Sequence, residues 1–101
     1  MSRKRPLVRV RSRHPLSFWG VLDVQQWLRR QLPHMYSQYG QLLIEHDING
    51  RILIDVSESA LEQIGISDKN DRLELLYHIK KAKLKSDYDE LNNYQKIIDS
   101  N

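Results

Sequence analysis

The sequence contains no cysteine, few glycines and no long apolar run, and each of these shortages argues against a class of protein. Without cysteine the chain has no disulfide, no thiolate nucleophile and no cysteine-based zinc site, so we expect an intracellular, cytoplasmic protein. Only 4 glycines are present, and they form no glycine-rich phosphate-binding loop. No apolar run approaches the roughly 20 residues that cross a bilayer, and the basic N-terminus lacks the apolar stretch of a secretory signal.

Acidic residues are missing from the first 14 positions, where six cations gather: Arg3, Lys4, Arg5, Arg9, Arg11 and Arg13. The rest of the chain has ten basic and thirteen acidic residues, so the net charge of +3 combines a basic arm with a mildly acidic body. We predict that residues 1–16 form a disordered, solvated arm, because like charges repel and apolar groups are few. The alternatives are a nuclear-import signal, an acidic partner, or recruitment to the acidic inner face of the plasma membrane.

Apolar residues recur at helical spacing from residue 17 to residue 86, a length that suits one domain. Local signals divide this region: Pro33 ends the first helix, and the turn at residues 47–50 ends the second, with Asn49 and Gly50 tolerating positive φ. Ser57 is a candidate N-cap and Gly65 a candidate C-cap. We therefore predict helices over residues 21–32, 35–45, 52–54 and 58–64, and a long last helix that is capped by Ser67 or Asp68.

A heptad-like pattern runs from residue 84 into the segment 87–101 over about two repeats, fewer than a coiled coil needs. Its apolar and polar members are Leu84, Tyr88, Leu91, Gln95 and Ile98. Two interpretations stay open. The segment is either a frayed helical tail or a helical extension that packs on the domain or on a partner.

The order of these elements resembles the sterile alpha motif (SAM) domain over about residues 17–86. The resemblance rests on an opening tryptophan and a series of short motifs in the family's order: Trp19, Trp27-Leu28, Ile48-Asn49-Gly50, Ser57-Glu58-Ser59-Ala60-Leu61, Ile64-Gly65-Ile66 and Leu75-Leu76. It implies an all-α fold, a five-helix SAM bundle with a long C-terminal helix.

The resemblance also implies a non-catalytic adaptor that binds another SAM domain head to tail. One implied surface, the mid-loop face, comprises Glu45, His46, Asp47, Arg51, Asp55, Glu58 and Glu62. The other, the end-helix face, comprises Ser67, Asp68, Lys69, Asn70, Asp71 and Arg72. Acids dominate the mid-loop face, which suits the basic helix start of a partner. The end-helix face mixes both signs, which disfavours an open self-polymer.

Many SAM domains have Gly-His-Arg where this chain has Asn70-Asp71-Arg72. This departure, and the turn His46–Arg51, resemble a group of short single-domain SAM adaptors. That resemblance implies pairing with the SAM domain of connector enhancer of KSR, contact with a KSR- or RAF-type kinase, and a role in assembling a RAF-activating scaffold in Ras/MAP kinase signalling.

Two alternatives keep the fold but change the function: an RNA-binding SAM domain and a self-polymerising SAM scaffold. RNA binding needs several cations on one face, and Asp68 and Asp71 oppose it. An enzyme is disfavoured because the four histidines are scattered without metal-ligand spacing: His14, His34, His46 and His78. We therefore expect no metal, no cofactor and no small-molecule substrate.

Overall fold

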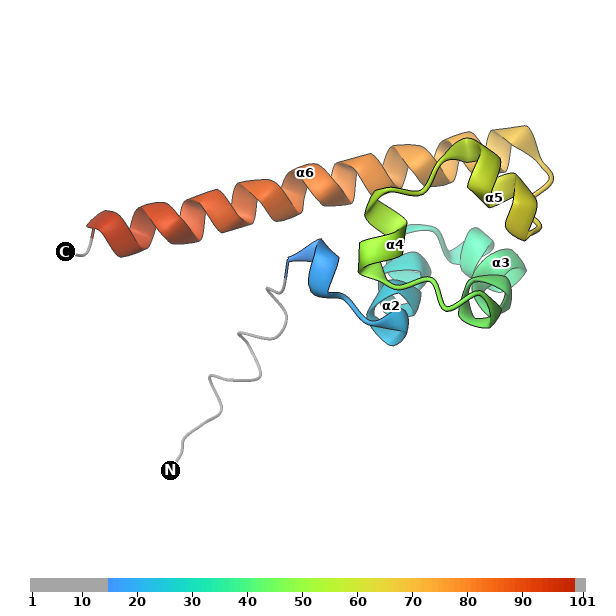
Figure 1. The fold of residues 1–101 in the computed structure, drawn as a ribbon, viewed down its shortest axis with the longest axis horizontal. Helices are drawn as coiled ribbons and strands as arrows, with labels where there is room; N and C mark the ends of the chain where they lie inside the picture. The colour runs from blue at the N-terminus through green and yellow to red at the C-terminus, as the bar shows by residue number, and fades with distance from the viewer. Residues whose placement is uncertain (1–14, 100–101) are drawn as a thin grey trace, which may run out of the picture.

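The computed structural model describes residues 15–99, and side chains as far as residue 92. Regular structure in this part of the chain is helical throughout, in the order η1 (Leu16–Phe18), α2 (Val21–Gln31), α3 (Pro33–Glu45), α4 (Gly50–Ile54), α5 (Glu58–Ile64) and α6 (Lys69–Asp99). The shorter helices gather around the first half of α6, and its second half projects beyond them (Figure 1). The prediction of five α-helices with a long last one is confirmed. The arm predicted for residues 1–16 lies outside the described residues, except for its last two positions.

A single apolar core joins all of these elements. Its buried members come from η1, from each of the five α-helices and from the connections between them: Leu16, Val24, Trp27, Leu28, Leu32, Met35, Tyr39, Leu43, Ile48, Leu53, Leu61, Ile66, Leu75 and Ile79. Leu16, which the prediction assigns to the arm, is only 2% exposed. Its backbone N–H donates to Ser86 Oγ at 2.9 Å and so ties η1 to α6.

The caps of α5 and α6 agree with the sequence. Ser57 Oγ accepts a hydrogen bond from the N–H of Ala60 at 3.0 Å, and Gly65 follows α5 with φ +126°, a backbone conformation that favours glycine. Asp68 Oδ1 accepts from the N–H of Asn70 at 2.8 Å and thereby caps α6. Each cap acts within a few residues, which explains why the sequence revealed it.

The turn between α3 and α4 differs from the prediction. Positive φ occurs at Asp47 (53°) and not at Asn49 or Gly50. Asn49 instead N-caps α4 with its side chain. Gly50 is needed for a close approach: its N–H donates to the Trp19 carbonyl at 2.9 Å, and a Cβ at this position would collide with the Leu16 carbonyl and lie 2.9 Å from Trp19 Cβ.

Helices α2 and α3 meet at a proline. The first helix ends at Gln31, one residue earlier than predicted, and α3 starts at Pro33, two residues earlier than predicted, with Leu32 between them. Proline fits the first helical position because its missing N–H would have no partner there. The buried side chain of Gln25 then joins the pair, donating from Nε2 to the Gly40 carbonyl at 3.0 Å.

Helix α6 extends 31 residues without interruption, well past residue 86. Its first half covers the core through Leu75 and Ile79. The backbone of residues 87–99 is helical as far as Asp99, which both interpretations of residues 87–101 allow. Packing of this segment on a partner stays a prediction. None of the described helices is both long and apolar enough to cross a membrane.

Candidate protein-interaction surfaces

The mid-loop face is built from the end of α3, the following turn, α4 and α5. Six of its seven residues are exposed: Glu45, His46, Asp47, Arg51, Asp55 and Glu62. The end of α5 lies close to α3 at this end of the fold. A Cβ added to Gly65, the residue after α5, would lie only 3.1 Å from the side chain of Leu42 in α3. Glu45 and Glu62 therefore lie on neighbouring helices. The acidic character that the sequence predicts for this face is available to solvent, and its role in binding stays a prediction.

Glu58 is the exception on this face because it forms an ion pair within the chain. Its Oε2 lies 3.3 Å from Arg72 Nη2 and accepts a hydrogen bond from Arg72 Nε, also at 3.3 Å. The Arg72 side chain is 9% exposed. Its Nη1 donates at 2.9 Å to the carbonyls of Ile66 and Ser67. Through these contacts Arg72 stabilises the connection between α5 and α6.

This position of Arg72 corrects the prediction that it presents a cation at the start of the last helix. An arginine four residues into a helix looks like a surface cation in sequence, and only the fold shows that its guanidinium turns towards two backbone carbonyls. The planar guanidinium group suits these contacts because it offers several N–H donors in fixed directions.

Asp71 also has a partner inside the chain. The Tyr39 hydroxyl donates to Asp71 Oδ2 at 2.5 Å, which joins α3 to the first turn of α6. This hydrogen bond, together with burial and the negative charges of Asp71 and Asp68, raises the pKa of Tyr39 to about 12. Asp71 is half-buried, so less of its charge reaches solvent than the sequence suggests.

The exposed remainder of the end-helix face is small and mixed in charge. It consists of Ser67, Asp68, Lys69 and Asn70. Within residues 67–72, Lys69 is the cation whose side chain reaches solvent. Two exposed apolar residues lie beside it on the outer side of α6, Leu73 (46% exposed) and Tyr77 (60% exposed), and neither was predicted as part of a surface. Their spacing of four is the signal that could have revealed them.

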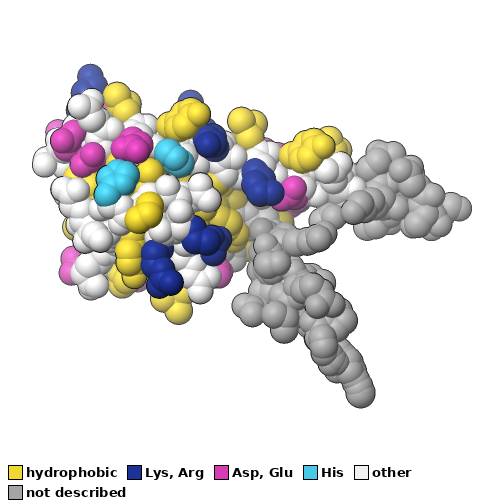
Figure 2. Space-filling model, turned by 180° about the vertical axis from the view of Figure 1, so that it is seen from behind, with side chains coloured by type: hydrophobic (Ala, Val, Ile, Leu, Met, Phe, Trp, Pro, Cys, Tyr) yellow, Lys and Arg dark blue, Asp and Glu magenta, His cyan; other side chains and the backbone are white. Residues whose placement is uncertain are grey.

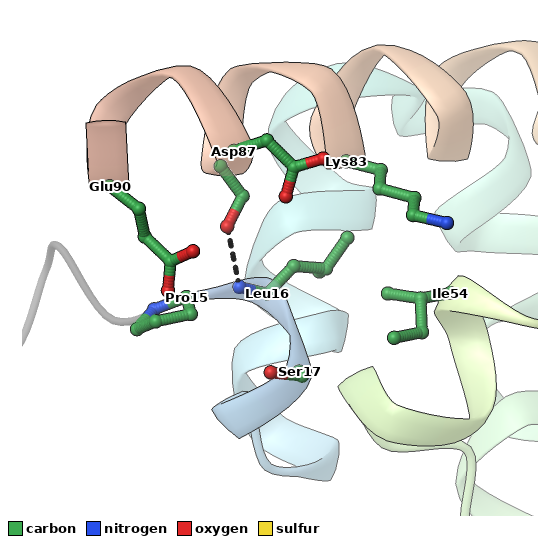
Figure 3. A pocket seen from close by; sticks show the side chains of 8 residues that line it. Pro15, Leu16, Ser17, Ile54, Lys83, Asp87 and Glu90 are labelled. Atoms are coloured by element: carbon green, nitrogen blue, oxygen red, sulfur yellow. Dashed lines mark hydrogen bonds between the residues drawn. The ribbon is translucent and has the colours of Figure 1, made fainter. Parts of the chain in front are cut away.

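A small pocket lies beside η1, between that segment, α4 and the second half of α6 (Figure 3). Its lining residues are Pro15, Leu16, Ser17, Ile54, Lys83, Ser86, Asp87 and Glu90. Its volume of about 80 Å³ is well below the roughly 300–1,000 Å³ of typical small-molecule sites. Within the described part of the chain, no group of three or more His, Cys, Asp or Glu side chains could hold a metal ion.

Comparison with known families agrees with this architecture. Residues 16–83 match the SAM domain (sterile alpha motif) family, which spans the chain from η1 to the middle of α6. The chain belongs to the sterile alpha motif family. This SAM domain is also 38% identical over 79 residues to Protein aveugle of Drosophila melanogaster, covering 78% of this chain and 74% of that relative. The chain is thus a protein-interaction module similar to Aveugle, and the resemblance seen in the sequence is confirmed.

Proposed function

We propose that this protein is a non-catalytic adaptor that binds another SAM domain through its acidic mid-loop face. The observation that carries the proposal is the internal use of Arg72, whose guanidinium is bound to Glu58 and to two backbone carbonyls. With that cation withdrawn, the end-helix face is left with Lys69 beside Asp68. The exposed acids of the mid-loop face are the stronger electrostatic feature, and they fit the basic helix start of a partner.

The proposed partner is the SAM domain of connector enhancer of KSR, and the proposed role is to link it to a RAF-activating scaffold in Ras/MAP kinase signalling. Contact with a KSR- or RAF-type kinase belongs to the same proposal, as do a cytoplasmic location and recruitment to the inner face of the plasma membrane. Similarity to Aveugle over most of both chains supports this choice.

The same geometry weighs against both alternatives that share the fold. A head-to-tail polymer needs two complementary faces on each copy, and RNA binding at the start of the last helix needs several exposed cations. Burial of Arg72 removes a cation that both would use. Asp68, which caps α6, and Asp71 and Glu74 in the first two turns of this helix would also repel phosphate.

The proposal is tested by isothermal titration calorimetry, in which the full chain is titrated with purified SAM domains of Ras-pathway scaffolds. We expect saturable one-to-one binding to the connector enhancer of KSR domain and no binding to an unrelated SAM domain. A gel-shift titration with stem-loop RNA is run in parallel on the full chain and on a chain that lacks residues 1–14. RNA binding that survives removal of the arm, without binding to any SAM domain, would overturn the proposal.

A further inference from the structure

The outer side of α6 carries a stripe of exposed apolar side chains that no described element covers. The members of this outer stripe are 46–69% exposed: Leu73, Tyr77, Leu84, Tyr88 and Leu91. At 3.6 residues per turn they fall within an arc of about 60°, on the side of α6 opposite to Leu75 and Ile79. Apolar side chains form a row along the free edge of α6 in Figure 2, towards its C-terminal end.

One flank of the outer stripe has an ordered charge pattern. Lys80, Lys83, Asp87 and Glu90 are all exposed, and they read as two cations followed by two acids. The spacing is symmetric, because Lys83 and Asp87 are equally distant from residue 85, as are Lys80 and Glu90. This flank lies between the stripe and η1, and three of its members border the small pocket there (Figure 3).

We propose that the outer stripe binds the same stripe of a second copy of this chain, with the two α6 helices antiparallel and related by a two-fold axis near residues 84 and 85. In such a pair the flank of one chain faces the same flank of the second chain, with the order of the residues reversed. Lys80 then lies opposite Glu90 of the second copy, and Lys83 lies opposite Asp87 of the second copy. The flank is therefore complementary to itself, which selects a second copy over an unrelated helix.

The apolar residues pair about residue 84, one residue and about 1.5 Å along the helix from the centre of the charged flank. Leu84 lies at the two-fold axis and meets its own copy, and Tyr77 meets Leu91 of the second copy. In a parallel, in-register pair each flank would instead face the opposite flank of the second copy, so Lys80 would lie near Lys85 of the second copy. Like charges at such sites are unfavourable, and the two halves of the flank could not pair with each other. The charge order thus selects the antiparallel arrangement.

The opposite flank does not prevent this arrangement. Lys85, which lies close to the two-fold axis on that side, is paired within its own helix: its Nζ is 3.2 Å from Asp89 Oδ2. Lys81 Nζ lies 5.4 Å from the centre of the Tyr77 ring. These contacts reduce the repulsion that two lysines near the axis would otherwise cause.

Analytical ultracentrifugation of the full chain over a concentration series tests the proposal. We expect the mass to rise from the monomer value of 12.0 kDa towards twice that value. Lys80→Glu with Lys83→Glu makes the flank wholly acidic, and Asp87→Lys with Glu90→Lys makes it wholly basic, so each double variant should remain monomeric. An equimolar mixture of the two should dimerise again, because the two flanks become complementary. Arg29→Glu with Arg30→Glu, on exposed positions of α2, is the matched control and should dimerise normally.

Disulfide cross-linking determines whether the two helices are parallel or antiparallel. The chain has no cysteine of its own, so each introduced cysteine can be tested alone. A mixture of Tyr77→Cys and Leu91→Cys chains should form the mixed disulfide, and Tyr77→Cys alone should not. A wild-type chain that stays monomeric up to its solubility limit would overturn the proposal, as would charge variants that dimerise like the control. Efficient cross-linking of Tyr77→Cys to itself would overturn the antiparallel arrangement. All of these variants retain the mid-loop face, so their failure leaves the proposed function standing.

Discussion

Arg72 Nη2 lies 3.3 Å from Glu58 Oε2, and this ion pair joins the first turn of α6 to the first turn of α5. Each of the two residues comes from one of the surfaces that the family resemblance implies for partner binding. Their pairing shows that part of the charge on both surfaces is used to hold the domain together. What remains for a partner is an exposed acidic set on one side and a nearly neutral end-helix face on the other.

Replacing Arg72 should lower the stability of the isolated domain, measured without any partner. Arg72→Ala removes the ion pair and leaves the carbonyls of Ile66 and Ser67 without their donor, so we expect a loss of about 3 kcal/mol in the free energy of unfolding. Urea unfolding followed by circular dichroism measures it. Lys69→Ala, at the neighbouring exposed position, should change stability by less than about 0.5 kcal/mol. Equal effects from the two variants would contradict the internal role of Arg72.

The Tyr39–Asp71 hydrogen bond should make stability fall at high pH. The pKa of Tyr39 is raised from 10.0 to about 12 in the folded chain, so the folded state holds this proton more tightly than the unfolded state. The stabilisation is complete below pH 10 and is lost as the pH rises from 10 to 12. Tyr39→Phe should cost about 1–2 kcal/mol at neutral pH, and its difference from wild type should shrink across that window.

Urea titrations at pH 7, 9, 10, 11 and 12 measure this difference, and Tyr77→Phe at an exposed position serves as the control. A Tyr39→Phe variant whose deficit stays constant from pH 9 to pH 12 would show that the hydroxyl does not contribute through this proton.

Gly50 should tolerate no side chain. Gly50→Ala places a Cβ against the Leu16 carbonyl and within 2.9 Å of Trp19 Cβ, so we expect a loss of about 2 kcal/mol or more. Gly20→Ala is the matched control: its nearest neighbour would be Asp23 Oδ2 at 3.8 Å, and its loss should stay below about 1 kcal/mol. Thermal unfolding of both variants decides the point, and a Gly50→Ala variant as stable as Gly20→Ala would refute the close-approach explanation.

The domain should begin at Leu16 in energetic terms as well. Deletion of residues 1–14 should leave the unfolding free energy unchanged, because the described core contacts start at Leu16. Leu16→Ala should cost about 3 kcal/mol, as for other fully buried leucines. Chemical unfolding of the two proteins compares them directly. A deletion that destabilises as much as Leu16→Ala would mean that the arm contributes to the folded domain.

The sequence predicted the features of this fold that depend on near neighbours. Ser57, Gly65 and Asp68 act on backbone groups within three residues, and their chemistry is visible without knowledge of the fold. The chain positions of the helices follow from the same kind of signal, apart from the starts of α3 at Pro33 and of α4 at Gly50, each two residues earlier than predicted.

Features that depend on contacts between distant segments could not be predicted in this way. Gly50 is fixed by the carbonyl of Leu16, more than thirty positions earlier, and Arg72 is fixed by Glu58 and by a connection that bends back towards it. In sequence both have a plausible local explanation, a flexible turn and a surface cation. The sequence therefore did not show that the charge of Arg72 is used inside the chain, and the acidic residues of the mid-loop face stay a prediction as a binding site.

The most direct test of the central claim is a calorimetric titration of charge variants against the SAM domain of connector enhancer of KSR. Glu45→Lys with Glu62→Lys reverses two exposed acids of the mid-loop face. Lys69→Glu reverses the exposed cation of the end-helix face and leaves Arg72 intact. Asp87→Lys with Glu90→Lys is the control with the same charge change as the first pair, placed on the second half of α6.

All three proteins should keep the wild-type circular dichroism spectrum. The account predicts that the mid-loop pair abolishes binding, and that Lys69→Glu and the control bind like the wild type. Loss of binding in Lys69→Glu with retention in the mid-loop pair would contradict it.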